Sequence, residues 1–149
     1  MTHDKNMPST VINLKESEDI RDVVHRVVQS LAEGSIVGVP TESNYCFVAA
    51  ATCRAAVERA CALADNYHNE PRLTIAIKSC DEATDWVPDM RPLARRFARQ
   101  CWPGPLAMVV ADNHPDGLVQ QLPVSTQPHV LCDDRIRLRA PRHRILQDC

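Results

Sequence analysis

The sequence predicts a single α/β domain, and three observations lead to that prediction. The chain has 149 residues, a length that suits one domain with its own core. Hydrophobic residues make up 44% of the chain but aromatic residues only 4%, so the core should be aliphatic. Segments with helical spacing of apolar residues and short apolar runs follow one another without strict alternation. This order favours helices packed on a mixed sheet.

The first predicted helix has the most regular spacing of apolar residues. Ser17 is its expected N-cap, and Gly34 is the residue expected to end it. Because valine is a weak helix former, burial must stabilise this segment. Residues 1–16, which precede it, are expected to form a tail or an added edge strand. The apolar residues at helical spacing are Ile20, Val23, Val24, Val27, Val28 and Leu31.

Two strands and a second helix are expected next. The apolar run 35–39 predicts a strand, a polar loop covers 40–45, and the run 46–51 predicts the following strand. A helix over about 53–64 follows, with Thr52 as its expected N-cap.

Short elements continue through the second half of the chain. Pro92 suits a first helical turn, Ser79 suits the cap of an earlier helix, and Trp102–Pro105 predicts a rigid turn. Residues 112–128 are rich in turn formers and are expected to be mostly loop. The expected strands are 73–77, 106–110, 129–132 and 136–138, and the expected helices are 81–86, 92–100 and 142–149.

Composition excludes several classes of function. The formal net charge of −2 gives no overall electrostatic case for nucleic-acid binding. Seven cysteines without a Cys-x-x-Cys pair, together with a polar N-terminus, are typical of a cytoplasmic protein with reduced thiols. The six histidines lack the spacing of metal ligands, so no metal site is expected. No apolar run reaches the length of a membrane span, and no membrane partner is expected.

One cluster of basic residues lies near the C-terminus. Arg135, Arg137 and Arg139 alternate along a predicted strand and would therefore share one face. Such a face could follow the phosphates of tRNA or double-stranded RNA, with weak and strongly salt-dependent binding. A solvated strand edge, partly neutralised by Asp133 and Asp134, explains the pattern equally well.

The most informative segment is Pro40–Tyr45, where polar residues begin abruptly at the end of an apolar run. Strand ends are where ligands bind in α/β sheets. Two further motifs follow at Trp102–Leu106 and Arg139–His143. These three motifs, in this order and at these separations, resemble those of the Sua5/YciO/YrdC family. The resemblance covers roughly residues 17–149.

The resemblance implies a YrdC-like twisted mixed sheet with flanking helices, and a relation to L-threonylcarbamoyladenylate synthesis for tRNA modification. It implies that Thr41, Ser43, Tyr45 and Arg139 bind substrate or nucleotide, whereas it assigns no catalytic residue. ATP and Mg²⁺ would be needed if the family activity is retained. The family's later Ser-x-Asn element would lie beyond Cys149, so the domain is expected to be incomplete at its C-terminus.

The chain also departs from the family pattern. Ala64, Asn66 and Glu70 stand where the family has Lys, Arg and Lys. Because cationic groups must neutralise the triphosphate during adenylate formation, we expect catalysis to be impaired. Arg72, two positions after Glu70, is the candidate replacement. The alternative is a non-catalytic binding or regulatory module that serves a fused C-terminal catalytic domain or a separate enzyme.

Two cysteines invite a catalytic interpretation. The spacing from Cys53 to Arg59 matches that of tyrosine phosphatases, but the segment has helical periodicity and lacks glycine, which favours a structural helix. Cys46 lies next to the Pro40–Tyr45 loop, although a cysteine at a family glycine position more often serves packing. We expect that loop and Arg139 to line one concave surface.

Overall fold

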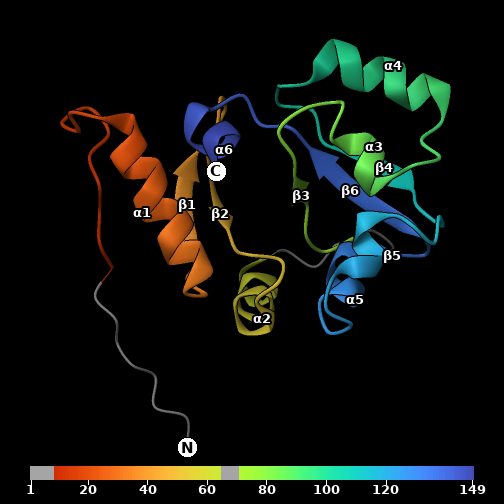
Figure 1. The fold of residues 1–149 in the computed structure, drawn as a ribbon, viewed down its shortest axis with the longest axis horizontal. Coiled ribbons are helices and arrows are strands. Elements are labelled where there is room, and N and C mark those ends of the chain that lie inside the picture. Colours follow the sequence, from red (N-terminus) through yellow and green to blue (C-terminus); the bar gives the residue numbers. More distant parts are fainter. Residues whose placement is uncertain (1–8, 65–70) are drawn as a thin grey trace, which may run out of the picture.

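The computed structural model describes residues 9–64 and 71–149 (Figure 1). It confirms the predicted α/β class and the mixed sheet. The helices are α1 (Ile20–Ala32), α2 (Arg54–Leu63), α3 (Ala83–Trp86), α4 (Pro92–Cys101), the 3₁₀ helix η1 (Leu118–Gln121), α5 (Gln127–Val130) and α6 (Arg144–Asp148). The strands are β1 (Val37–Pro40), β2 (Tyr45–Val48), β3 (Ile75–Ala76), β4 (Met108–Ala111), β5 (Leu131–Cys132) and β6 (Arg135–Arg139).

The strands form two separate ladders. β1 and β2 make an antiparallel hairpin in which Val37 lies opposite Val48 and Pro40 lies opposite Tyr45. The second sheet has the order β3-β6-β4, with β3 parallel and β4 antiparallel to β6. β5 pairs antiparallel with the first part of β6. β6 is therefore an interior strand with partners on both sides.

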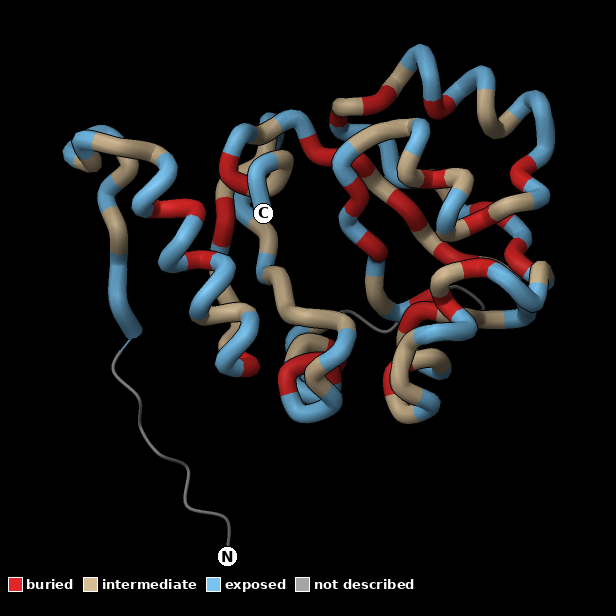
Figure 2. The backbone as a smooth tube through the Cα atoms, viewed as in Figure 1, coloured by how far each residue is buried: buried red, intermediate tan, exposed pale blue. Residues whose placement is uncertain are grey.

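Each ladder has its own hydrophobic core (Figure 2). The larger core lies around β6 and includes Ile136 and Leu138, which are fully buried. The smaller core lies between α1, the hairpin and α6. Its buried members are Val23, Val27, Val39 and Ile145.

The start of α1 differs from the prediction. Its N-cap is Asp19, whose carboxylate accepts a hydrogen bond from the Arg21 amide at 2.9 Å. The Ser17 hydroxyl instead donates to the Asn13 carbonyl, in a turn before the helix. Gly34 follows the helix with a φ of 80°, so a glycine is suited to this position, as predicted. A Cβ there would also lie 2.9 Å from the Cys53 sulfur.

Several other expected boundaries require correction. Cys53, rather than Thr52, is the N-cap of α2, and its side chain makes no capping hydrogen bond. Residues 127–130 form α5, so the strand expected at 129–132 begins only at residue 131. Pro128 explains this difference, because proline suits a first helical turn and cannot donate to a ladder. The edge strand considered for 1–16 is absent from 9–16; residues 1–8 lie outside the described residues.

The predicted rigid turn after α4 is present. The Trp102 indole N–H donates to the Leu106 carbonyl at 2.6 Å, and the Gly104 amide donates to the Ala140 carbonyl at 2.8 Å. A Cβ at Gly104 would lie 2.3 Å from the Cys101 carbonyl oxygen, so only glycine fits. The turn is thereby attached to the chain that follows β6.

Throughout residues 9–64 and 71–149, no helix combines the length and apolar character that crossing a bilayer requires.

Candidate ligand site between the two ladders

The loop Thr41–Asn44, which joins β1 and β2, is held by the Thr41 side chain. The Thr41 hydroxyl donates to the Asn44 carbonyl at 2.7 Å and accepts from the Asn44 amide at 3.1 Å. It also accepts from the Ser43 amide at 3.3 Å. Because one hydroxyl has a single proton and two lone pairs, these contacts occupy it fully. Thr41 therefore fixes the shape of the loop.

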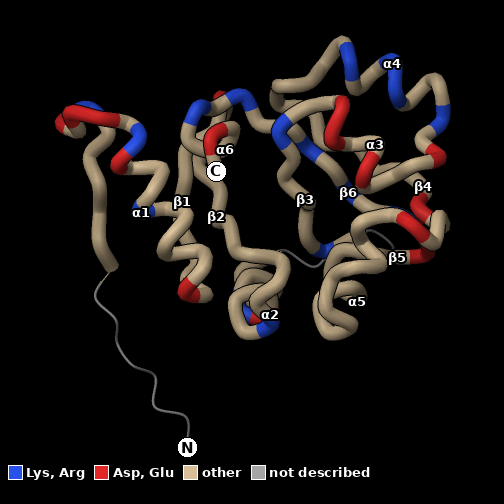
Figure 3. Tube along the Cα trace, viewed as in Figure 1, with Lys and Arg blue, Asp and Glu red and all other residues tan. Residues whose placement is uncertain are grey.

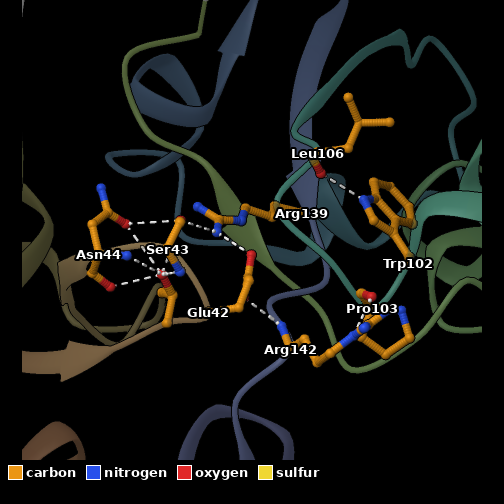
Figure 4. A network of polar contacts seen from close by, with 9 residues as sticks. Glu42, Ser43, Asn44, Trp102, Pro103, Leu106, Arg139 and Arg142 are labelled. Atoms are coloured by element: carbon orange, nitrogen blue, oxygen red, sulfur yellow. Dashed lines mark hydrogen bonds and ion pairs between the residues drawn. The ribbon is translucent and has the colours of Figure 1, made fainter.

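Glu42 connects this loop to the end of β6 (Figure 4). Its Oε1 lies 2.5 Å from Arg139 Nη2, and its Oε2 accepts from the Arg142 amide at 2.7 Å. The Arg142 guanidinium donates in turn to the Pro103 carbonyl at 3.0 Å. The three sequence motifs therefore meet in one network. Glu42 lies within the first motif, but the sequence predicts no role for it.

The ion pair between Glu42 and Arg139 is largely shielded, since the two side chains are 18% and 19% exposed. Burial acts to raise the pKa of Glu42, but hydrogen bonds from Arg139 and from the amides of Glu42 and Arg142 outweigh it. The pKa of Glu42 is therefore lowered, and the carboxylate stays ionised at neutral pH. It neutralises Arg139 at the point where the motifs meet.

A cavity of about 470 Å³ lies beside this network. Thr41, Arg72 and Arg139 all line it, so the structure brings these three predicted site residues together. Most of the remaining lining is apolar and comes from β2, α2, β3 and the turn after α4. No carboxylate belongs to the lining formed by the described residues.

Ser43 and Tyr45 are placed differently. The Ser43 hydroxyl lies 3.4 Å from Arg139 Nη2, but Ser43 is not part of the cavity lining. Tyr45 is 77% exposed at the start of β2 and is also outside the lining. Of the positions where the family has cationic residues, Ala64 directly follows α2, whereas Asn66 and Glu70 lie outside the described residues.

Residues 29–147 match the model of the family described as "Sua5_yciO_yrdC: Telomere recombination". The chain belongs to the Sua5/YciO/YrdC family. This family is related to threonylcarbamoyladenylate synthesis in the context of tRNA modification. The resemblance inferred from the three motifs is therefore confirmed.

Solved structures of Sua5 and YciO are similar to this chain. A double-alanine variant of P. abyssi Sua5 is 24% identical, with a TM-score of 0.72 over 93% of this chain and 39% of that one. P. abyssi Sua5 complexed with L-threonine is 25% identical, with a TM-score of 0.65 over 84% of this chain and 34% of that one. E. coli YciO is 19% identical, with a TM-score of 0.68 over 86% of this chain and 57% of that one.

These matches confirm the YrdC-like fold. They also show that the chain spans between about a third and three fifths of the length of these proteins. A comparison with curated protein sequences gives no significant match.

Neither cysteine considered as a nucleophile gains support from the geometry. Cys46 lines the cavity of this family member, but burial raises the pKa of its thiol despite the nearby charge of Arg139. Cys53 precedes α2, and the Arg59 guanidinium donates to the Gly34 carbonyl. The segment with phosphatase-like spacing is therefore a structural helix, as the sequence favoured.

The arginines of β6 share one half-buried face, as their alternation predicted. The alternative of a solvated strand edge is wrong, because β6 has paired neighbours on both sides. Arg135 lies 3.4 Å from the Asp133 carboxylate, and Arg139 is paired with Glu42. The charges of Arg135 and Arg139 are thus offset within the chain.

Proposed function

We propose that this chain is a YrdC-like binding module whose cavity takes L-threonine, and that it does not itself form threonylcarbamoyl-adenylate. The observation that carries the proposal is the joint placement of Thr41, Arg72 and Arg139 around a cavity of about 470 Å³. P. abyssi Sua5, solved as a complex with L-threonine, supports the choice of ligand. In this proposal the module serves a fused catalytic domain or a separate enzyme.

Charge balance favours a zwitterionic amino acid over ATP. Glu42 offsets Arg139, and Arg72 is the other cationic side chain in the lining formed by the described residues. A triphosphate needs several cationic groups, and Mg²⁺ bound to nucleotides is usually held through protein carboxylates. The lining formed by the described residues contains none, so these residues do not fit a magnesium–triphosphate complex. A zwitterion carries no net charge, so it needs neither several cationic groups nor a bound Mg²⁺.

The substitutions at the family's cationic positions support the same conclusion. Ala64, Asn66 and Glu70 remove three positive charges and add one negative charge. Loss of one charge-assisted hydrogen bond costs on the order of 1.5–3 kcal/mol, so the combined loss would severely weaken triphosphate binding. A nucleoside monophosphate, with less charge, is the next candidate ligand.

Calorimetric titration with L-threonine, AMP and ATP tests the proposal. We expect saturable binding of threonine, weaker binding of AMP and no pyrophosphate release from ATP with threonine and bicarbonate. Arg72→Gln should weaken threonine binding. Arg26→Gln, at an exposed position on α1, is the matched control and should leave threonine binding unchanged. Pyrophosphate release at the rate of an ordinary family member would overturn the proposal and indicate Arg72 as a relocated phosphate ligand. Absence of threonine binding would overturn the choice of ligand.

RNA binding by Arg135, Arg137 and Arg139 stays a prediction. The offset of Arg135 by Asp133 and of Arg139 by Glu42 reduces the positive charge that this face would offer to phosphates.

A further inference from the structure

The outer edge of β4 is an unprotected sheet edge. In the second sheet β4 is the terminal strand, with β6 on one side and no strand of the described residues on the other. Proteins usually protect such an edge with a charged side chain, a proline or a bulge, because its free N–H and C=O groups can pair with another chain. Residues 106–111 contain neither a charged residue nor a proline, and the register of β4 with β6 is regular.

The backbone of alternate residues points away from β6. The Asp112 amide donates to the Asp134 carbonyl at 2.7 Å, in continuation of the register between β4 and β6. Because neighbouring residues of an antiparallel strand direct their N–H and C=O groups to opposite sides, those of Val109 and Ala111 face the free edge. The same alternation directs the groups of Ala107 to that side. No loop or cap hydrogen bond within the described residues reaches these three residues.

The side chains along this edge leave room for a neighbouring strand. Val109 is 39% exposed, and Ala107 and Ala111 are exposed and small. The alternate side chains, Met108 and Val110, pack in the larger core and hold the strand in place. A second strand could therefore pair with β4 without displacing a bulky or charged side chain.

The two ends of the edge carry opposite charge. Beyond the C-terminal end of β4, the side chains of Asp116 and Asp133 are 87% and 74% exposed. Figure 3 shows acidic residues gathered beside β4 and β5. At the other end, the exposed Arg142 guanidinium donates to the Pro103 carbonyl at 3.0 Å and makes no ion pair among the described residues. An antiparallel second copy would place the acidic end of each chain beside the basic end of the other.

We propose that β4 pairs antiparallel with β4 of a second copy of this chain, with Val109 on the two-fold axis. In this register Val109 lies opposite its own counterpart and Ala107 lies opposite Ala111. Every outward residue then meets an outward residue, and each such pair exchanges two hydrogen bonds. Uncharged side chains meet in the middle, and Asp116 of one copy lies near Arg142 of the other. A two-fold interface uses the same patch on both copies, as the pairing of a strand with itself requires.

A second copy fits this edge better than another occupant does. An unrelated extended peptide could make the same backbone hydrogen bonds, but it would leave the opposite charges of the two ends without a role. Because the two-fold axis of such a pair is perpendicular to the sheet, the joined sheet presents the β6 arginines of both copies on one side. The proposal is independent of which ligand the cavity takes.

Sedimentation velocity of the whole chain under reducing conditions, over a range of about 1–300 μM, tests the proposal. We expect a reversible equilibrium between monomer and dimer. Val109→Lys places two cations opposite each other on the axis and should weaken dimerisation by about tenfold or more. Val124→Lys is the matched control, because that side chain is 82% exposed in a turn outside β4, and it should leave the equilibrium unchanged. Asp116→Lys should also weaken dimerisation, because it brings a cation near Arg142.

Cross-linking tests the register and does not depend on the folding of Val109→Lys. Hydrogen-bonded residues of an antiparallel pair have Cα atoms about 5.5 Å apart, a distance that suits a disulfide. Val109→Cys should therefore form a linked dimer on mild oxidation, whereas Ala111→Cys, which lies opposite Ala107, should not. The wild-type chain, oxidised in the same way, is the control for the native cysteines, and mass spectrometry of the linked peptides identifies the bond.

Three results would overturn the proposal. One is a wild-type chain that stays monomeric at every concentration, whether or not its β4 edge captures an extended peptide. Another is a Val109→Lys variant that is folded by circular dichroism and dimerises as tightly as Val124→Lys. The third is a link through Ala111→Cys that forms as readily as the link through Val109→Cys.

Discussion

The two ladders of this protein differ in how much apolar packing stabilises them. The sheet region, made of β3–β6 with α3–α5, has a large buried cluster around Ile136 and Leu138. The hairpin region, made of α1, β1, β2 and α6, buries only four apolar residues in its cluster. A two-stranded ladder is marginal by itself. The hairpin region therefore depends on its neighbours, and the candidate site lies where the two regions meet.

Specific polar contacts join the regions. Glu42, at the tip of the hairpin, holds Arg139 and the Arg142 amide. Thr126, ahead of α5, donates to the Ala51 carbonyl just beyond β2. Both Thr41 and Arg139 line the cavity, one from each region. A ligand that contacts both would reinforce the junction, because binding to the folded state stabilises it.

The largest expected effect comes from the core of the sheet region. Leu138→Ala removes a side chain with 0% exposure from the interior strand and should cost about 2–5 kcal/mol in the free energy of unfolding. Val109→Ala on adjacent β4, where the side chain is 39% exposed, is the control and should cost less than about 1 kcal/mol. Urea unfolding measures both.

The same experiment tests whether the two regions unfold together. Val39→Ala empties part of the smaller core, where Val39 is 1% exposed. If it produces a separate early transition while Leu138→Ala shifts the main one, the hairpin region is an independent unit of lower stability. A single transition for both variants would show that the junction couples the regions.

The sequence predicted the order and type of most elements, and its errors have physical causes. Apolar spacing located α1 within two or three residues, because that helix buries a stripe of side chains against a core. The start signals Thr52 and Pro92 located α2 and α4 as closely. The N-cap of α1 was harder to predict, since Ser17 and Asp19 are both good N-cap residues. The choice between them depends on the turn that precedes the helix. The prediction of a strand at 129–132 was wrong for its first half, because residues 129 and 130 belong to α5.

Breaking the junction should have the next largest effect. Glu42→Gln leaves Arg139 without its anionic partner and should cost about 1–3 kcal/mol, since the pair is largely shielded. Glu58→Gln removes the exposed pair with Arg54 on α2 and should cost less than about 0.5 kcal/mol. Thermal unfolding at pH 7 measures the difference. Equal losses would mean that the junction is not held by this ion pair.

The pH dependence of Glu42 has a defined sign. Its folded pKa is lowered, so its contribution is present above the unfolded pKa and is lost as the pH falls through the folded pKa. Wild-type stability should therefore decrease in acid more steeply than that of Glu42→Gln. Parallel curves between neutral pH and strong acid would contradict the lowered pKa.

A substitution in the sheet region, Asp112→Asn, should stabilise the protein rather than destabilise it. Asp112 is 2% exposed, and among the described residues neither of its carboxyl oxygens has a partner in good hydrogen-bond geometry, the His114 amide being only a weak contact. Burial raises its pKa, and the charge of Asp134 adds to this, although the His114 amide acts against it. Asp112→Asn should therefore stabilise the protein at neutral pH, by on the order of 1 kcal/mol.

The sign of this effect also sets its pH window. Because the folded pKa of Asp112 is raised, the folded state binds the proton more tightly, and wild-type stability falls as the pH rises from the unfolded pKa through the folded one. The advantage of Asp112→Asn should vanish in acid. Asp116→Asn is the control, because its side chain is 87% exposed. It should leave the free energy of unfolding unchanged at every pH. A destabilised Asp112→Asn would indicate that the carboxylate has partners in solution.

The candidate site was only partly predictable. The order of the motifs predicts that Thr41 and Arg139 lie on one surface, because ligand-binding residues gather at strand ends. Which side chains contact one another was not encoded in that order. Glu42 neutralises Arg139 through a contact across 97 residues, and such a pairing leaves no local pattern in the sequence.

The smallest expected effect tests the second contact between the regions. Thr126 is fully buried, and its hydroxyl donates to the Ala51 carbonyl at 3.0 Å across 75 residues. Thr126→Val keeps the shape but removes the donor, and should cost about 1 kcal/mol. Thr84→Val is the matched control, because that exposed hydroxyl donates only to the nearby Asp81 carbonyl. Since Thr126 also lines the cavity, L-threonine affinity should be measured beside urea unfolding. If Thr126→Val costs no more than Thr84→Val, the hairpin region is held to the sheet region by Glu42 and by apolar contact, and the α5 side of the cavity is free to move.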